Sequence, residues 1–166
     1  RRAVWLGALA IRHPAYADLR AVAAALAETV GATLGFLAEG GNAAGAYLAG
    51  AVPHREAGGD AAPAGGRTAR EMLSKPQAGY LLVGALEPWS DSVFSTAAAT
   101  LASSPFVVAA TPYASEQLKS VAHVLLPVAS FAETSGTYVN LEGRWQTVAA
   151  AVKALGEARP AWKVLR

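Results

Sequence analysis

The sequence contains no cysteine, and this absence excludes several kinds of chemistry at once. Without a thiol the chain can form no disulfide, no thiolate zinc site, no cysteine-ligated iron–sulfur cluster and no cysteine nucleophile. Redox chemistry, if the protein performs any, is therefore expected outside these 166 residues.

Strong charge of one sign is also absent. The chain has 14 Lys and Arg against 12 Asp and Glu, a formal net charge of +2, and no basic run longer than Arg1–Arg2. Because nucleic-acid binding usually needs clustered basic residues, no nucleic-acid partner is predicted. A hydrophobic content of 53% with so little net charge is typical of one packed domain rather than of a disordered chain.

Long uninterrupted hydrophobic runs are missing as well. The apolar stretch Ala3–Ile11 is too short to cross a bilayer, and residues 21–48 are interrupted by charged residues and glycine. The first stretch also lacks the small-residue cleavage site of a signal peptide. We therefore expect no direct membrane insertion. Because Met72 is the only methionine, we expect the chain to be a segment of a longer protein.

What the sequence does contain is an alternation of short apolar runs with helical patterns. Strands are predicted over Ala3–Ala10, Ala32–Ala38, Gly79–Gly84, Pro105–Ala110 and Val121–Leu126. Helices are predicted over Pro14–Val30, with Pro14 at the first helical position, and over Ala43–Leu48, Arg67–Leu73 and Ser92–Leu101, with a helical turn at Ser115–Leu118. Runs that are apolar on both faces and separated by helices are typical of a covered parallel sheet. The sequence therefore predicts a doubly wound α/β fold, with a mostly parallel sheet and helices on both faces.

Two regions depart from this alternation. Residues 52–66 are rich in glycine and proline and have no periodicity, which predicts a flexible surface loop. Within residues 131–148, strands over Thr137–Leu141 and Arg144–Val148 are predicted to form a small hairpin around Glu142–Gly143. The end of the chain, residues 156–166, is predicted to enter a further helix. Residues 1–166 are thus interpreted as a single α/β segment.

A glycine-rich turn, Gly40–Gly45, lies where a predicted strand meets a predicted helix. Free backbone N–H groups at such a place can hold a phosphate. The turn misses the G-x-G-x-x-G pattern because Asn42 stands at the second required glycine. A simpler interpretation is that Asn42 caps the short helix and the glycines form the turn. The capping interpretation is favoured, and the phosphate interpretation stays open.

The other residue types with useful chemistry form no catalytic constellation. His13, His54 and His123 lie on different predicted elements, without the close spacing of a metal site on one element. No serine stands in a G-x-S-x-G or S-x-x-K context. The sequence therefore predicts neither a metal centre nor a serine nucleophile.

Carboxylates and tryptophans are interpreted structurally. The carboxylates considered are Glu87, Asp91, Glu133 and Glu142. Nothing in the sequence pairs them, and Asp91 is predicted to cap the helix that begins at Ser92. The tryptophans, predicted to fill the core or an interface, are Trp5, Trp89, Trp145 and Trp162.

The densest group of polar residues lies in Pro127–Gln146, PVASFAETSGTYVNLEGRWQ. Polar side chains at every second position of a ribbon can form a solvated face. In a hairpin held by Gly136 and Gly143, they can instead form a buried network against another domain. In that second case Arg144→Ala is expected to destabilise the domain or its docking by roughly 1 to 3 kcal/mol, because its partner would be left buried and unpaired.

These residues also carry a family resemblance. The segment Val124–Gln146 resembles the V-V-L-P-x-x-x-x-x-E-x-x-G-T-x-x-N-x-E-G-R-x-Q signature of the molybdopterin oxidoreductase superfamily. The matching residues are Pro127, Glu133, Gly136, Thr137, Asn140, Glu142, Arg144 and Gln146.

Within the superfamily, the chain is most similar to the branch formed by the iron–sulfur-bearing subunit of bacterial NADH-quinone oxidoreductase, respiratory complex I. The stretches that carry this narrower resemblance are Asn42–Pro53, Tyr80–Pro88 and Gly156–Trp162. Glu142 is followed by Gly143 and Arg144 rather than by an arginine pair typical of molybdenum or tungsten relatives, which favours the complex I branch.

The resemblance implies a non-catalytic structural segment of the peripheral arm, with no catalytic, cofactor or metal ligand of its own. It implies iron–sulfur clusters in the rest of the parent subunit. The implied partners are other domains of that subunit and other peripheral-arm subunits of complex I, and the implied location is the cytoplasmic face of the bacterial inner membrane.

Two alternatives stay open. The first is the cofactor-binding domain of a molybdopterin guanine dinucleotide oxidoreductase such as a formate dehydrogenase. In that domain Gly41, Asn42 and Asn140 would face the cofactor. The second is a stand-alone nucleotide-binding module, which would bind a free nucleotide.

Overall fold

The computed structural model describes residues 1–87, 89–90 and 97–166. The predicted cap Asp91 and the first part of the predicted helix over Ser92–Leu101 lie outside the described residues. That helix is described from Ala97 to Ala102 as α5. Among the described helices, none combines the length and the apolar character needed to cross a bilayer.

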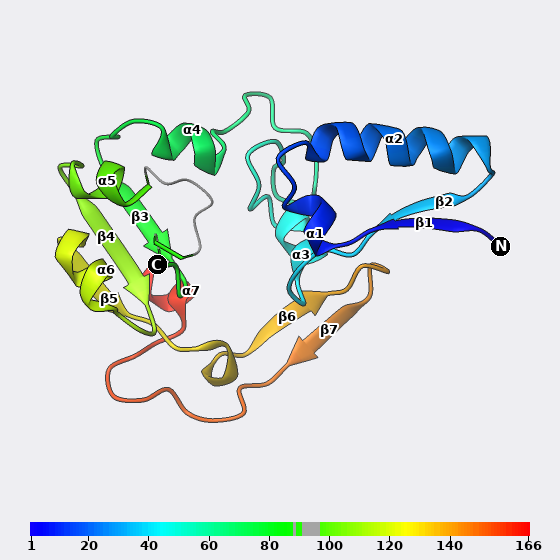
Figure 1. Ribbon diagram of the computed structural model, residues 1–166. Coiled ribbons are helices and arrows are strands. Elements are labelled where there is room, and N and C mark those ends of the chain that lie inside the picture. The colour runs from blue at the N-terminus through cyan, green and yellow to red at the C-terminus, as the bar shows by residue number, and fades with distance from the viewer. Residues whose placement is uncertain (88, 91–96) are drawn as a thin grey trace.

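The amino-terminal part is a β-α-β unit (Figure 1). Its elements are β1 (Ala3–Leu6), α1 (Ala8–Ile11), α2 (Tyr16–Thr29) and β2 (Thr33–Phe36). The two strands pair in parallel, and α2 buries Ala23 and Ala27. α2 begins at Tyr16, two residues later than predicted. As predicted, Gly31 terminates it, just after the cap residue Val30, with a φ of +60° in the left-handed region. β1 is shorter than predicted, because the alanines and leucine after Gly7 favour the helical turn α1.

A short helix and a long connection follow. Helix α3 spans Ala43–Leu48, as predicted, and α4 spans Ala69–Leu73. The Thr68 side chain accepts a hydrogen bond from the Glu71 N–H, and the Glu71 carboxylate accepts one from the Thr68 N–H, so α4 begins with a capping box. Between these helices, residues 52–66 contain no helix or strand and only an isolated bridge between Arg55 and Ala61.

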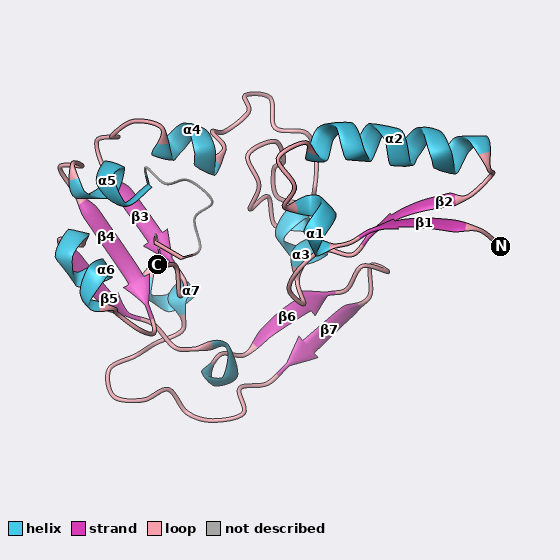
Figure 2. Cartoon of the chain, in the orientation of Figure 1, coloured by secondary structure: helices cyan, strands magenta, loops and turns pink. Residues whose placement is uncertain are grey.

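The second sheet contains three parallel strands in the order β3-β4-β5 (Figure 2). Its elements are β3 (Tyr80–Val83), β4 (Val107–Thr111), α6 (Glu116–Val121) and β5 (Val124–Pro127), with α5 between β3 and β4. The main core lies on one face of this sheet, where Leu82, Val107 and Ala109 pack with Leu101 of α5 and Leu118 of α6. β5 begins later than predicted because α6, whose first turn is capped by the Ser115 hydroxyl, continues to Val121.

The predicted hairpin is present near the end of the chain. A 3₁₀ turn (Phe131–Glu133) leads into β6 (Gly136–Val139), which pairs antiparallel with β7 (Trp145–Val148). The last helix, α7, spans Ala161–Val164. The predicted strand over Thr137–Leu141 ends at Val139, since residues 140–144 form the turn.

The α/β class, the parallel strands and the hairpin extension are confirmed. The strands are divided into the pair β1-β2, the sheet β3-β4-β5 and the hairpin β6-β7 in the described part of the chain. The order of strands and helices in a sequence indicates parallel pairing, but it does not say which strands are neighbours. The long connection through residues 52–66 separates the first β-α-β unit from the second sheet.

Candidate functional site

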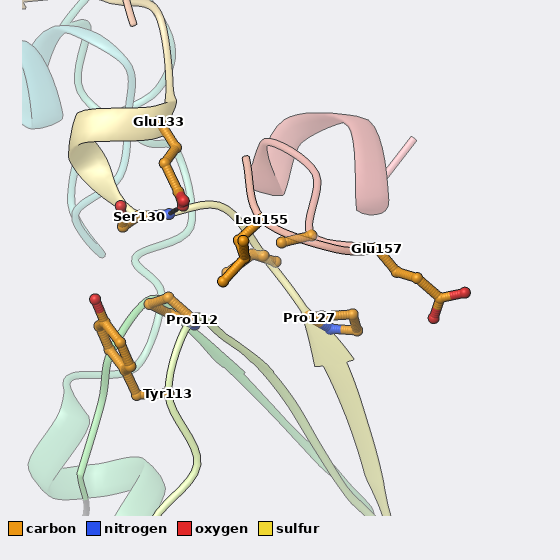
Figure 3. Close-up of a pocket in the computed structure, with 9 residues that line it drawn as sticks. Pro112, Tyr113, Pro127, Ser130, Glu133, Leu155 and Glu157 are labelled. Carbon is orange, nitrogen blue, oxygen red and sulfur yellow. Dashed lines mark hydrogen bonds between the residues drawn. The ribbon is translucent and has the colours of Figure 1, made fainter. Parts of the chain in front are cut away.

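Two neighbouring cavities lie at the carboxyl ends of β3, β4 and β5, the edge at which open α/β sheets bind ligands. The larger has a volume of about 470 Å³, is mostly apolar and is lined by residues 83–85, 112–113, 128–132 and Ala161. The smaller, of about 260 Å³, is shown in Figure 3. Its lining includes Pro112, Tyr113, Pro127, Ser130, Glu133, Leu155 and Glu157.

Glu133 is the fixed carboxylate of the smaller cavity. Its Oε2 accepts a hydrogen bond of 2.8 Å from the Ser130 backbone N–H, within a second capping box (Figure 3). This bond is the main cause that lowers the pKa of Glu133, with smaller contributions from the Ser130 hydroxyl and the Leu155 backbone, while desolvation opposes it. Glu157 projects away from Glu133 in Figure 3, so the two carboxylates do not form an acid/base pair.

A clamp joins α3 to the hairpin. Asn42 stands at the start of α3, but its side chain makes no cap within that helix. Instead, the Asn42 Oδ1 accepts a hydrogen bond of 2.8 Å from the backbone N–H of Val139 in β6. Gly45 leaves the room for this arrangement, because a Cβ atom at Gly45 would lie 2.0 Å from the Asn42 Oδ1. The capping role predicted for Asn42 is therefore wrong: it positions the hairpin, 97 residues away in the sequence.

Asn140 has a local task in the hairpin turn. Its Oδ1 accepts hydrogen bonds from the backbone N–H groups of Glu142 and Arg144, at 3.0 and 2.9 Å. Such bonds from an asparagine to the backbone ahead of it stabilise tight turns. Gly143 completes the turn at a φ of +79°.

The clamp borders a third cavity, of about 220 Å³, between α3 and the hairpin. Asn42 and Gly45 line one side, and Thr137, Val139 and Trp145 line the other. Of the three residues predicted to face a cofactor in the alternative interpretation, the structure places Asn42 at this cavity and Asn140 in the turn. Gly41 lies near the Tyr138 ring.

The remaining signature residues lie along β5, the hairpin and its turn. Pro127 ends β5, Gly136 and Thr137 begin β6, and Gln146 faces Tyr138 across the ribbon. The side chains of Glu142, Arg144 and Gln146 are exposed.

The three histidines lie apart in the fold. The His13 Nδ1 accepts a hydrogen bond from the Ala15 N–H, and the His123 Nδ1 accepts one from the Val107 N–H. His54 packs edge-on against Tyr47. Across the described residues no group of three His, Cys, Asp or Glu side chains is placed to hold a metal ion.

All four tryptophans are exposed, so the core role considered for them is wrong, and the interface role stays a prediction. Among the carboxylates, Glu87 accepts a hydrogen bond of 2.7 Å from the Ser115 hydroxyl. Because Ser115 also caps α6, this bond ties the segment after β3 to the start of α6.

Comparison with protein-family models identifies the family of this chain. The family model described as molybdopterin oxidoreductase matches residues 1–166, the whole chain. The chain belongs to the molybdopterin oxidoreductase family. The resemblance inferred from the signature residues is thereby confirmed.

Curated relatives point to two branches of the family. The NADH-ubiquinone oxidoreductase 78 kDa subunit of Candida albicans is 51% identical over 47 residues, 28% of this chain and 6% of the relative. The 75 kDa subunit of Reclinomonas americana is 45% identical over 47 residues, again 28% of this chain and 7% of the relative. The F420-dependent formate dehydrogenase 2 subunit alpha of Methanococcus maripaludis is 35% identical over 104 residues, 61% of this chain and 15% of the relative. The chain thus spans a small part of each relative.

The molybdopterin cofactor implied by the family name does not fit the lining of the carboxyl-edge cavities. In its dinucleotide form the cofactor carries phosphates, which proteins usually hold with basic side chains or with clusters of free backbone N–H groups. Among the described residues that line these two cavities there is no Lys, Arg or His, and Glu133 and Glu157 contribute negative charge. A carboxylate held ionised by the Ser130 N–H would repel a phosphate.

The residues that follow the strands and line these cavities carry no distinctive sequence motif. Gly84 and Ala85 come directly after β3, and Pro112 and Tyr113 come directly after β4. The carboxyl ends of neighbouring parallel strands meet at one edge, so residues at these positions could have been picked out once the strands were predicted. Glu133 was predicted as an unpaired carboxylate and as a signature residue, but not as part of a cavity at this edge.

An acid-sensitive stability is expected from Glu133. Since folding lowers its pKa below the ordinary value of about 4.3, its contribution to stability is complete above that value and is lost as the pH falls through the lower, folded-state pKa. Glu133→Gln should therefore remove part of the loss of stability on acidification. Urea unfolding of both proteins from neutral to acidic pH measures this, with Glu142→Gln as the control in an exposed turn. An unchanged pH dependence in Glu133→Gln would contradict the assignment.

Arg144→Ala is expected to have a small effect on the fold. The Arg144 side chain is exposed and makes no hydrogen bond or ion pair with the described residues. The buried network predicted for it is therefore absent within the described part of this chain. Surface changes of this kind usually alter the free energy of unfolding by less than about 0.5 kcal/mol. Urea denaturation tests this, and a loss of more than about 1 kcal/mol would show a partner for Arg144 within the chain.

Proposed function

We propose that this chain is a non-catalytic structural segment of the iron–sulfur-bearing subunit in the peripheral arm of an NADH:quinone oxidoreductase, where it supports electron transfer from NADH to quinone. The observation that carries the proposal is the pair of cavities at the carboxyl edge, which have an ionised Glu133 and no basic lining residue among those described. The relatives named as NADH-ubiquinone oxidoreductase subunits, and the absence of cysteine, support it.

The proposal assigns no catalytic residue, cofactor or metal to this segment. Iron–sulfur clusters are placed in other parts of the parent subunit. The partners are other domains of that subunit and other peripheral-arm subunits of complex I, and the location is the cytoplasmic face of the bacterial inner membrane, to which the complex attaches the segment.

The residues that carry the family resemblance then have structural tasks. Asn42 and Gly45 hold the hairpin on α3, Asn140 holds the hairpin turn, and Glu133 holds the turn before β6. In this account the motif shared with the family preserves the backbone of the hairpin region. The exposed Glu142 and Arg144 are available for contacts with other domains.

Substitutions at the cavity and at the backbone separate this role from a catalytic one. In the full-length subunit within its complex, Tyr113→Ala is expected to leave NADH:quinone turnover per assembled complex unchanged, because Tyr113 lines a cavity that takes no part in the reaction. Gly50→Ala places a Cβ atom 2.6 Å from the Glu56 backbone at a residue with a φ of +72°, so it is expected to lower the amount of assembled complex, with the same turnover per complex. A large fall in turnover per assembled complex in either variant would contradict the proposal.

One alternative is favoured by a specific observation. The formate dehydrogenase relative matches 104 residues of the chain, more than twice the 47 matched by the Candida subunit. In that case the segment would be a cofactor-binding domain of a molybdopterin guanine dinucleotide oxidoreductase, with Gly41, Asn42 and Asn140 toward the cofactor. The Oδ1 atoms of Asn42 and Asn140 already accept backbone hydrogen bonds, which counts against this role. Stoichiometric molybdenum or tungsten in the parent protein would support it.

A further inference from the structure

One face of the β3-β4-β5 sheet is apolar, and several of its side chains are exposed to solvent. Successive residues of a strand point to opposite faces, and Leu82, Val107 and Ala109 lie on the face covered by α5 and α6. The opposite face carries Ala110, which is fully buried, and six further apolar residues. These six are called here the open face: Leu81, Val83, Phe106, Val108, Val124 and Leu126. Leu81 is 54% exposed, Phe106 48%, Val83 46% and Val124 37%.

The topology explains why the helices between these strands leave this face uncovered. The chain moves in one direction across the sheet, from β3 to β4 to β5, and the two connections carry α5 and α6. Connections between parallel strands are right-handed, so both helices lie on the same face. Parallel sheets are normally covered on both faces. A helix that covers the open face would then belong to a connection that crosses the sheet in the opposite direction, to a strand next to β3 on the side away from β4.

We propose that the open face is the docking surface of an amphipathic α-helix from another segment of the same polypeptide. The inference rests on the proposed function only in placing these residues within a longer subunit. The matched regions cover 6% to 15% of the curated relatives, so most of the length of such a subunit lies outside them. The expected occupant is a helix, because a right-handed connection to a strand beyond β3 would place its helix on this face.

The charge of the surface agrees with this occupant. None of the six residues of the open face is charged, so an apolar helix face complements it. A membrane surface would instead favour apolar residues accompanied by Lys and Arg. The test must distinguish this helix from two other occupants of the open face, a second copy of the chain and a membrane.

Carbene footprinting of the wild-type, full-length subunit tests whether the open face is covered. Labelling of Leu81 and Val124 is expected to be several-fold lower in the native protein than in the same protein unfolded in urea, at every protein concentration and without lipid. Labelling that stays high in the native protein would overturn the proposal. Protection that appears only at high protein concentration, or only with vesicles, would also overturn it.

Photo-crosslinking identifies what covers the face. With p-benzoylphenylalanine in place of Phe106 in the full-length subunit, the crosslinked peptide is expected to come from a helix outside these 166 residues of the same polypeptide. The same probe in place of Leu9, which is 90% exposed and lies away from the sheet, should not give that crosslink. A crosslink to a second copy, to another subunit, to lipid or to residues within this chain would overturn the proposal. Neither readout depends on metal content or turnover, so its failure is distinct from failure of the proposed function.

Discussion

Gly50→Ala is expected to destabilise the chain by about 3 kcal/mol or more, because two penalties combine at this position. Gly50 follows α3 with a φ of +72°, in the left-handed region that disfavours any side chain. A Cβ atom there would also lie 2.6 Å from the backbone carbon of Glu56 and 2.7 Å from the backbone nitrogen of Ala57. Backbone atoms cannot rotate aside as a flexible side chain can, so the connection after α3 would have to move.

Gly31 provides the matched control for this prediction. It follows α2 as Gly50 follows α3, at a φ of +60°, but no atom lies within 4 Å of the position of its Cβ. Gly31→Ala should therefore cost only the left-handed penalty, roughly 1 to 2 kcal/mol. Urea unfolding of the two variants measures the difference. Equal losses of stability would mean that the loop around Glu56 yields without cost.

Asn42→Ala is expected to cost about 1 to 3 kcal/mol, because it removes the acceptor of the Val139 N–H and leaves that group without its partner. Val139 is only 3% exposed, so water has little access to replace the bond. Gly45→Ala should destabilise by a related route, since the new methyl group displaces the Asn42 side chain from the hairpin. Its loss is expected to be smaller, because alanine favours a helix over glycine by about 1 kcal/mol.

The double variant Asn42→Ala/Gly45→Ala tests whether the two residues act together. In the Asn42→Ala background the obstacle to a Cβ atom at Gly45 is gone, so Gly45→Ala should become stabilising by about 0.5 to 1 kcal/mol. Chemical denaturation of the wild type, both single variants and the double variant gives the coupling free energy. Additive effects would rule out the clamp between Asn42, Gly45 and Val139.

The local structure was largely predictable because it depends on neighbouring residues. Helix α3 begins and ends where the glycine-rich turn and its apolar residues indicated, and Gly31 ends α2 as expected. The hairpin turn followed from Gly143 and the polar residues around it. These features arise from backbone preferences over a few residues, which a sequence displays directly.

Long-range features were not predictable in the same way. The sequence indicated Asn42 as a helix cap, since nothing near it pointed to a hydrogen bond with Val139, 97 residues away. The division of the parallel strands into two sheets and the open face of β3-β4-β5 depend on which strands become neighbours. A strand with apolar residues on both faces was predicted to be covered on both sides. The sequence of the strand does not indicate whether the covering helix belongs to this chain.

The candidate site shows the same limit. Glu133 was visible as a signature residue, but its fixed carboxylate depends on the capping box with Ser130 and on the chain returning near Leu155. Tyr113 was not predicted to line a site, because a tyrosine that follows a strand forms no distinctive sequence pattern. Both residues line the same cavity only because the ends of neighbouring strands meet at one edge of the sheet.

Metal analysis of the intact parent protein tests most directly whether this segment supports the chemistry without holding a pterin cofactor. The protein is purified from cells supplied with both molybdate and tungstate, and an active formate dehydrogenase from the same cells serves as the positive control. We expect iron from the clusters in other domains, with molybdenum and tungsten far below one atom per polypeptide. One atom of either metal per polypeptide would contradict the account.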